Sequence, residues 1–117
     1  MSKVIHTENA PAAIGTYSQA RSTENLTFIS GQIPLDPATM EIVKGDFKSR
    51  ARRVFMNIQA IAEEAGGSLN DICKLTIFLT DLNDFSAVNE VMEEYFDSPY
   101  PAPVSYTHLT LPTNREV

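Results

Sequence analysis

The sequence predicts a two-layer α+β domain in which two helices pack on one face of a mixed β-sheet. Residues 47–65 and 83–96 repeat apolar side chains at helical spacing, and several stretches around them alternate apolar and polar side chains as strands do. The chain has 117 residues, 43% of them hydrophobic, which suits one domain with its own core.

The strands expected before the first helix are short runs rich in β-forming residues. They lie at residues 4–5, 17–20, 26–33 and 41–43. Gly31 interrupts the third run, which suggests a bulge or a close approach of backbone at that position. Residues 36–39 form a turn, because Pro37 has the φ angle that a turn requires.

The first helix has recognisable ends. Asp46 is placed to cap its first turn, and Gly66 and Gly67 stop it. A strand follows at residues 75–79. The second helix begins near residues 83–84 and ends before Pro99 and Pro101, since proline cannot continue a helix. Residues 104–117 are the last strand, so the predicted order is β-β-β-β-α-β-α-β.

Charge and composition exclude several classes of partner. A net charge of −6 opposes binding to nucleic acid, which needs clustered cations. A basic cluster does lie in the first helix, and we interpret it as a solvated face: Lys48, Arg50, Arg52 and Arg53. No apolar run approaches the roughly 20 residues of a membrane span. The one cysteine, Cys73, is predicted to be packed, and a reducing, cytoplasmic location fits this usage.

Residues with obvious chemistry are not arranged as known sites. His6 and His108 have no partners at ligand spacing, so no metal is expected. No glycine-rich loop precedes a helix, so no phosphate-bearing cofactor is expected either. Composition and spacing alone therefore predict an α+β domain of unknown role.

Four ordered motifs resemble those of the Rid family of reactive-intermediate deaminases, the RidA/YjgF group. They are residues 9–19 (NAPAAIGTYSQ), 28–34 (FISGQIP), 74–85 (KLTIFLTDLNDF) and 88–89 (VN). The resemblance covers residues 1–102 as one Rid-type domain. It implies a chorismate-mutase-like fold, a homotrimer with ligand clefts between subunits, and cofactor-free hydrolysis of 2-imino acids to 2-keto acids and ammonia. The expected substrates are 2-iminobutanoate and 2-iminopropanoate.

By matching motif, the resemblance implies that four residues bind the substrate: Tyr17, Ser30, Gly31 and Asn89. The hydroxyl of Tyr17 and the amide of Asn89 can orient substrate or water, and the backbone at Gly31 can approach a ligand closely. Imines hydrolyse readily, so positioning could suffice for catalysis. The structural alternatives are a packed aromatic at Tyr17, a strand bulge at Ser30 and Gly31, and a surface helix residue at Asn89.

The chain departs from the family at its C-terminal end. Pro103 stands where the family has an arginine, which would pair with the substrate carboxylate. A family glutamate on the final strand, which would move a proton of the attacking water, has no counterpart. Residues 103–117 look like translated linker or adapter sequence joined to a truncated gene. No catalytic residue is therefore assigned.

A smaller departure lies in the turn at residues 36–41. Met40 occupies a position where glycine is common in the family. If that position needs a left-handed backbone, methionine costs roughly 1 kcal/mol there.

Several functions follow from these observations. The leading one is imine deamination. The alternative is a non-catalytic ligand-binding or regulatory member of the family, which Pro103 favours. Ribonuclease activity, which some members are reported to show, is disfavoured by the acidic charge. A chorismate mutase is disfavoured because a dianionic substrate needs several cationic side chains.

Overall fold

The computed structural model describes residues 2–79 and 81–107, which form an α+β domain with two helices. The strands are β1 (Lys3–Ile5), β2 (Ala20–Ser22), β3 (Thr27–Ile29), β4 (Lys74–Leu79) and β5 (Ala102–Thr107). The helices are α1 (Phe47–Glu64) and α2 (Phe85–Tyr95), with 3-10 turns η1 (Leu69–Asp71) and η2 (Leu82–Asp84). The predicted fold class is confirmed.

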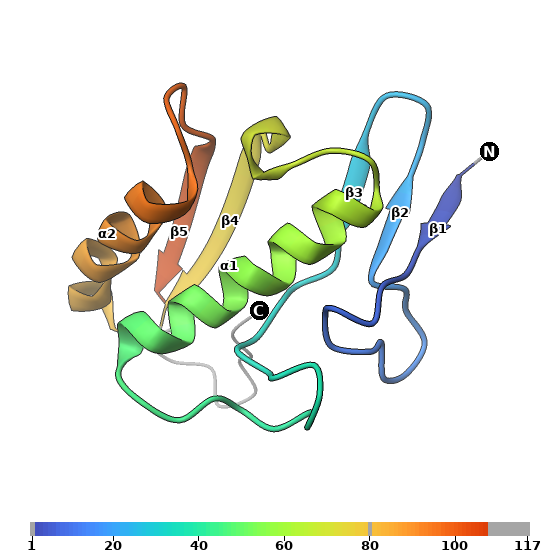
Figure 1. Ribbon diagram of the computed structural model, residues 1–117. Coiled ribbons are helices and arrows are strands. Elements are labelled where there is room, and N and C mark those ends of the chain that lie inside the picture. The colour runs from blue at the N-terminus through green and yellow to red at the C-terminus, as the bar shows by residue number, and fades with distance from the viewer. Residues whose placement is uncertain (1, 80, 108–117) are drawn as a thin grey trace.

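The strands run in both directions, as predicted, but they pair as two sheets. β1, β2 and β3 form an antiparallel sheet, while β4 and β5 pair in parallel with α2 as the crossover between them. Figure 1 shows α1 crossing in front of strands of both sheets, with α2 beside β5. The two helices contact each other and share one buried cluster, so they belong to the same layer.

Helix α1 joins two clusters of buried side chains. At its C-terminal end, Ile61 packs against a row that the strand register creates from Ile5, Ala20 and Ile29. Earlier in the helix, Phe55 and Ile58 enter the second cluster. The members contributed by other elements are Leu69, Leu79, Val88, Val91, Met92 and Phe96. Helix α1 thus packs apolar side chains against both sheets.

The predicted ends of α1 are confirmed. The carboxylate Oδ1 of Asp46 accepts a hydrogen bond from the backbone N–H of Ser49 at 2.9 Å, which satisfies one of the free donors of the first turn. At the other end Gly66 has a φ of +95°, and its N–H bonds to the Glu63 carbonyl at 3.0 Å. Glycine adopts this left-handed conformation without the strain of a side chain.

The early strands differ from the prediction. Residues 17–20 are not a strand, because β2 begins only at Ala20, and the strand predicted for residues 26–33 ends at Ile29. In place of residues 41–43 there is one isolated bridge between Leu35 and Ile42. The last strand begins at Ala102 and is described to Thr107; the predicted remainder lies outside the described residues.

Two single-residue expectations have clear outcomes. Met40 has a φ of +60°, so this non-glycine residue does occupy the left-handed region. The prediction that Cys73 is packed is wrong, because its side chain is exposed just before β4.

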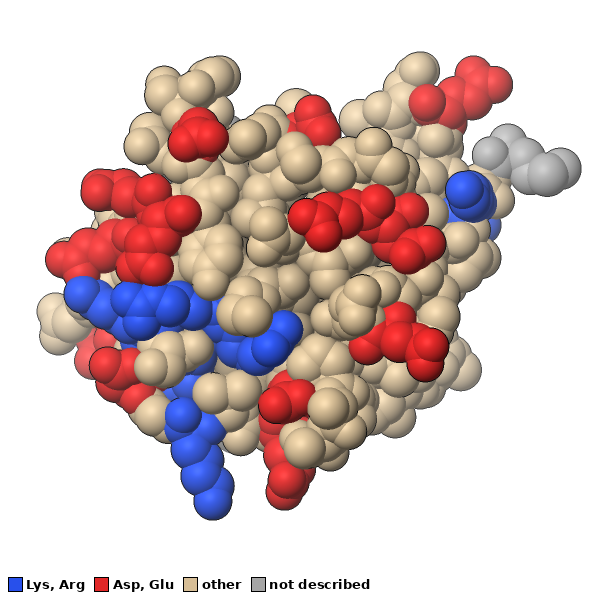
Figure 2. Space-filling view, in the orientation of Figure 1, with Lys and Arg blue, Asp and Glu red and all other residues tan. Residues whose placement is uncertain are grey.

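The basic cluster of α1 is a solvated face, as interpreted from the sequence. Lys48 forms an ion pair with Glu90, and the Arg52 guanidinium donates two bonds of 2.9 Å to the carboxylate of Glu94 on α2. Figure 2 shows these cations gathered on the helix face with carboxylates around them. Within residues 2–79 and 81–107, no helix has the length and apolar character needed to cross a membrane.

Candidate functional site

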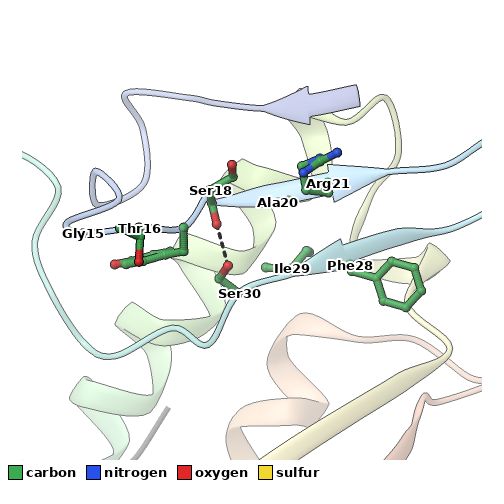
Figure 3. Close-up of a pocket in the computed structure, with 9 residues that line it drawn as sticks. Gly15, Thr16, Ser18, Ala20, Arg21, Phe28, Ile29 and Ser30 are labelled. Carbon is green, nitrogen blue, oxygen red and sulfur yellow. Dashed lines mark hydrogen bonds between the residues drawn. The ribbon is translucent and has the colours of Figure 1, made fainter. Parts of the chain in front are cut away.

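A surface hollow of about 610 Å³ lies where the loop before β2 meets the strands β2 and β3. We call it the Tyr17 hollow. Its lining residues are Gly15, Thr16, Tyr17, Ser18, Ala20, Arg21, Phe28, Ile29 and Ser30. Figure 3 shows the loop at Thr16 and Ser18 on one side and Ser30, at the end of β3, on the other. Two residues that the motifs assigned to the substrate are therefore brought together.

Two hydrogen bonds hold the opposing segments of the hollow together. The Oγ of Ser30 donates to the backbone carbonyl of Ser18 at 2.5 Å, and the backbone N–H of Ser30 donates to the carbonyl of Gln19 at 2.9 Å. The first of these bonds is visible in Figure 3. The proton of the Ser30 hydroxyl is used within the protein, so towards a ligand this oxygen can act only as an acceptor.

Tyr17 presents its phenol group at the surface. Its side chain is exposed, and its Oη accepts a hydrogen bond from the backbone N–H of Ile14 at 3.2 Å. A phenol can accept and donate at once, so the hydroxyl proton can still be directed to a ligand. The alternative of a packed aromatic is wrong for this residue in the single chain.

Arg21 and Phe28 line the hollow and were missed by motif reasoning. They are cross-strand partners on β2 and β3. Phe28 is 62% exposed. The Arg21 guanidinium contacts the Ser2 hydroxyl, and it is the only cationic side chain among the residues that line the hollow. Alternation could have identified Arg21 had the strand been placed at residues 20–22, because this exposed residue lies between buried Ala20 and half-buried Ser22.

The other predicted residues lie elsewhere. Gly31 follows Ser30 and is exposed. Asn89 is exposed on α2 and is not among the residues that line the hollow. Pro103 lies in β5 opposite Leu75 of β4. One chain therefore assembles only part of the predicted site: Tyr17 and Ser30 line the hollow, Gly31 follows Ser30 but is not among the lining residues, and Asn89 lies on α2.

Metal-ligating side chains are not clustered in the part of the chain that the structure describes. No group of three or more His, Cys, Asp or Glu side chains is placed there to hold an ion. The lining of the Tyr17 hollow instead offers hydroxyls, backbone groups, one cation and the apolar side chains of Ala20, Phe28 and Ile29.

Similarity to known proteins extends over almost the whole chain. A family model described as Endoribonuclease L-PSP matches residues 7–117, which includes the segment after Ala102 that the motifs left out. A RutC family protein of Pyrococcus abyssi is 56% identical over 94% of this chain and 87% of its own length. A protein of Dermatophagoides farinae named 2-iminobutanoate/2-iminopropanoate deaminase is 40% identical over 98% of this chain and 90% of its own.

Among solved structures, the fold is similar to that of RidA from an Antarctic Psychrobacter species. That structure has a TM-score of 0.88 and 50% sequence identity, covering 98% of this chain and 92% of that chain. The family match, the identity to these relatives and the shared fold agree with the four sequence motifs. The chain belongs to the Rid family, the RidA/YjgF group.

Proposed function

We propose that this chain hydrolyses 2-imino acids, such as 2-iminobutanoate and 2-iminopropanoate, to 2-keto acids and ammonia. One observation carries the proposal. Tyr17 and Ser30, which come from separate family motifs, line one open hollow together with the cationic Arg21. Relatives of about 40% identity that bear the deaminase name support the same class of reaction.

The reaction needs little from the protein. Water adds to the C=N carbon, the nitrogen gains protons, and the C–N bond breaks as the carbonyl forms, so imine and water become keto acid and ammonia. The Tyr17 hydroxyl is suited to donate a hydrogen bond to the imine nitrogen or the water, and the Ser30 oxygen to accept one. The rate enhancement comes from holding water and substrate in place, since no covalent bond between protein and substrate is required.

The active unit is proposed to be a homotrimer with the substrate between subunits. The outward row of the first sheet supports association, because Val4, Arg21 and Phe28 lie side by side across it and the two apolar members are exposed. Covering these two side chains in an interface would remove their apolar surface from water, which favours association. An inter-subunit cleft would also bring Asn89 of one chain towards the Tyr17 hollow of another.

The test is keto-acid release from freshly generated 2-iminopropanoate, measured against a protein-free blank. We expect release faster than the blank, and we expect Tyr17→Phe to lower kcat/KM about tenfold, which corresponds to about 1.4 kcal/mol of lost transition-state stabilisation. Tyr100→Phe is the matched control, because Tyr100 is also exposed but does not line the hollow. Release equal to the blank would refute the deaminase function for this chain.

A second candidate is a ligand-binding member without turnover. Pro103 favours it, because proline cannot supply the paired hydrogen bonds that an arginine gives a carboxylate. Restoring Pro103→Arg together with a family-like final strand separates the two. If turnover appears only in this variant, the chain as it stands binds its ligand without turnover.

The family description also names an endoribonuclease. A net charge of −6 and the pairing of Lys48 and Arg52 with carboxylates oppose RNA binding. Tight binding of single-stranded RNA at physiological salt would reverse that conclusion.

A further inference from the structure

Gln19 is a buried side chain that makes an unusual number of hydrogen bonds. It is 2% exposed and lies immediately before β2. Its Oε1 accepts from the backbone N–H of Thr7 at 2.7 Å. Its Nε2 donates to the carbonyls of Thr7 at 2.9 Å, Pro11 at 2.8 Å and Ala10 at 3.3 Å.

These bonds use both donor hydrogens of the carboxamide. The NH₂ group has two hydrogens for three carbonyl oxygens, so at least one hydrogen is shared between two acceptors. Because the group is buried and its donors are engaged by the backbone, it is not placed to bind substrate. Its effect must therefore pass through the backbone of residues 7–11.

The same residue also contacts the candidate site through its own backbone. Residues 7–11 lead into the loop that carries Tyr17, and Gln19 lies two residues after Tyr17, at the end of that loop. The carbonyl of Gln19 accepts the N–H of Ser30 at 2.9 Å. One residue thus ties together the start of the loop, the end of the loop and the segment of Ser30.

We propose that Gln19 is a positioning residue that sets the placement of Tyr17 relative to Ser30 for the reaction. The inference rests on the proposed function and deepens it by assigning a role to a residue that cannot touch the substrate. Buried polar networks of this kind fix one arrangement, since every alternative leaves carbonyl groups unsatisfied.

The decisive variant is Gln19→Glu, which keeps the size of the side chain and removes its donors. Three carbonyl oxygens would then face a carboxylate in a buried place, so the loop must shift. Misplacement of about 1 Å at a site can cost up to about 100-fold in rate, so we expect kcat/KM to fall about 10- to 100-fold. Gln59→Glu on α1 is the matched control, because the Gln59 side chain is only half-buried and makes no hydrogen bond within the described residues.

A pH profile separates positioning from general loss of structure. Burial and nearby carbonyl oxygens raise the pKa of a glutamic acid, and its protonated form can again donate one hydrogen bond. Relative to wild type, and after subtraction of the blank at each pH, kcat/KM of Gln19→Glu should recover as the pH falls. Gln19→Met has similar length and no titratable group, so it should lose activity without this pH dependence. It also decides the test if Gln19→Glu does not fold.

The outcomes are distinguishable. A wild-type chain without turnover refutes the proposed function, and this role for Gln19 with it. A wild-type chain with turnover, together with folded Gln19→Glu and Gln19→Met variants whose kcat/KM is unchanged, overturns the positioning role alone. Amide exchange at Ser30 adds a readout without substrate, and it should accelerate in both Gln19 variants but not in Gln59→Glu.

Discussion

Removing the side chain of Asn57 is expected to destabilise the fold strongly. Asn57 lies on α1 and is 0% exposed. Its Nδ2 donates to the carbonyls of Leu35 at 3.0 Å and Ile33 at 3.3 Å, and its Oδ1 accepts from the Arg53 Nε at 3.1 Å. These bonds tie the segment that follows β3 onto the helix.

The magnitude for Asn57→Ala follows from the two carbonyl groups that lose their donor. A buried acceptor left unsatisfied costs about 1–3 kcal/mol. Ile33 and Leu35 are half-buried, so water can reach them in part and the lower end of that range applies. We therefore expect a loss of about 2–3 kcal/mol, which is large against the total stability of about 5–15 kcal/mol that such domains have.

Urea unfolding followed by circular dichroism measures this loss. Wild type and variant must be compared at one protein concentration, because association makes apparent stability depend on concentration. Gln59→Ala, two positions along the same helix, controls for a truncated side chain that makes no hydrogen bond within the described residues. If the two variants differ by less than about 0.5 kcal/mol, the two carbonyl bonds do not hold this segment and the reasoning is wrong.

Three further outcomes are expected. Met40→Gly should stabilise the chain by about 0.5–1 kcal/mol in thermal unfolding, because it relieves a left-handed methionine, whereas Ala38→Gly in the same turn should not stabilise it. The bond from the Ser49 N–H lowers the pKa of the Asp46 carboxyl, so its contribution to stability is present above the ordinary aspartate pKa and is lost as pH falls through the lowered value. Asp46→Asn keeps a good cap; a variant with the same acid dependence as wild type in pH-dependent urea unfolding would contradict this cause. Arg21→Gln should weaken binding of 2-oxobutanoate about tenfold in calorimetry, because the hollow loses its cation; unchanged binding would mean that the carboxylate lies elsewhere.

The helices were predictable because their signals are local. Helical spacing of apolar residues identifies the face of α1 that holds Phe55, Ile58 and Ile61, and Asp46 and Gly66 mark its ends. Each of these signals acts within a few residues of the chain, so neighbouring sequence contains the information.

The first strands were harder because side chains compete with strand pairing. Residues 17–19 look β-forming, yet the Gln19 side chain bonds to the backbone of residues 7–11 and the Ser30 Oγ bonds to Ser18. Partners 8 to 12 residues away decide the local conformation there. Sequence periodicity is not sensitive to such bonds.

The candidate site was predictable only in part. Family motifs named Tyr17 and Ser30, which do share a hollow, but Arg21 was missed because the strand was placed too early. Asn89 lies away from that hollow within one chain, so its role depends on how chains assemble, which no single-chain pattern encodes.

The position of α1 between the two buried clusters has a consequence for synthesis on the ribosome. Ile5 and Ala20 become buried only when Ile61 of α1 packs on them. The three-residue strands made first cannot form a stable sheet alone, because small sheets need an apolar partner. The growing chain therefore exposes its N-terminal third until the end of α1 has left the exit tunnel, and a chaperone that acts during translation would meet that segment first.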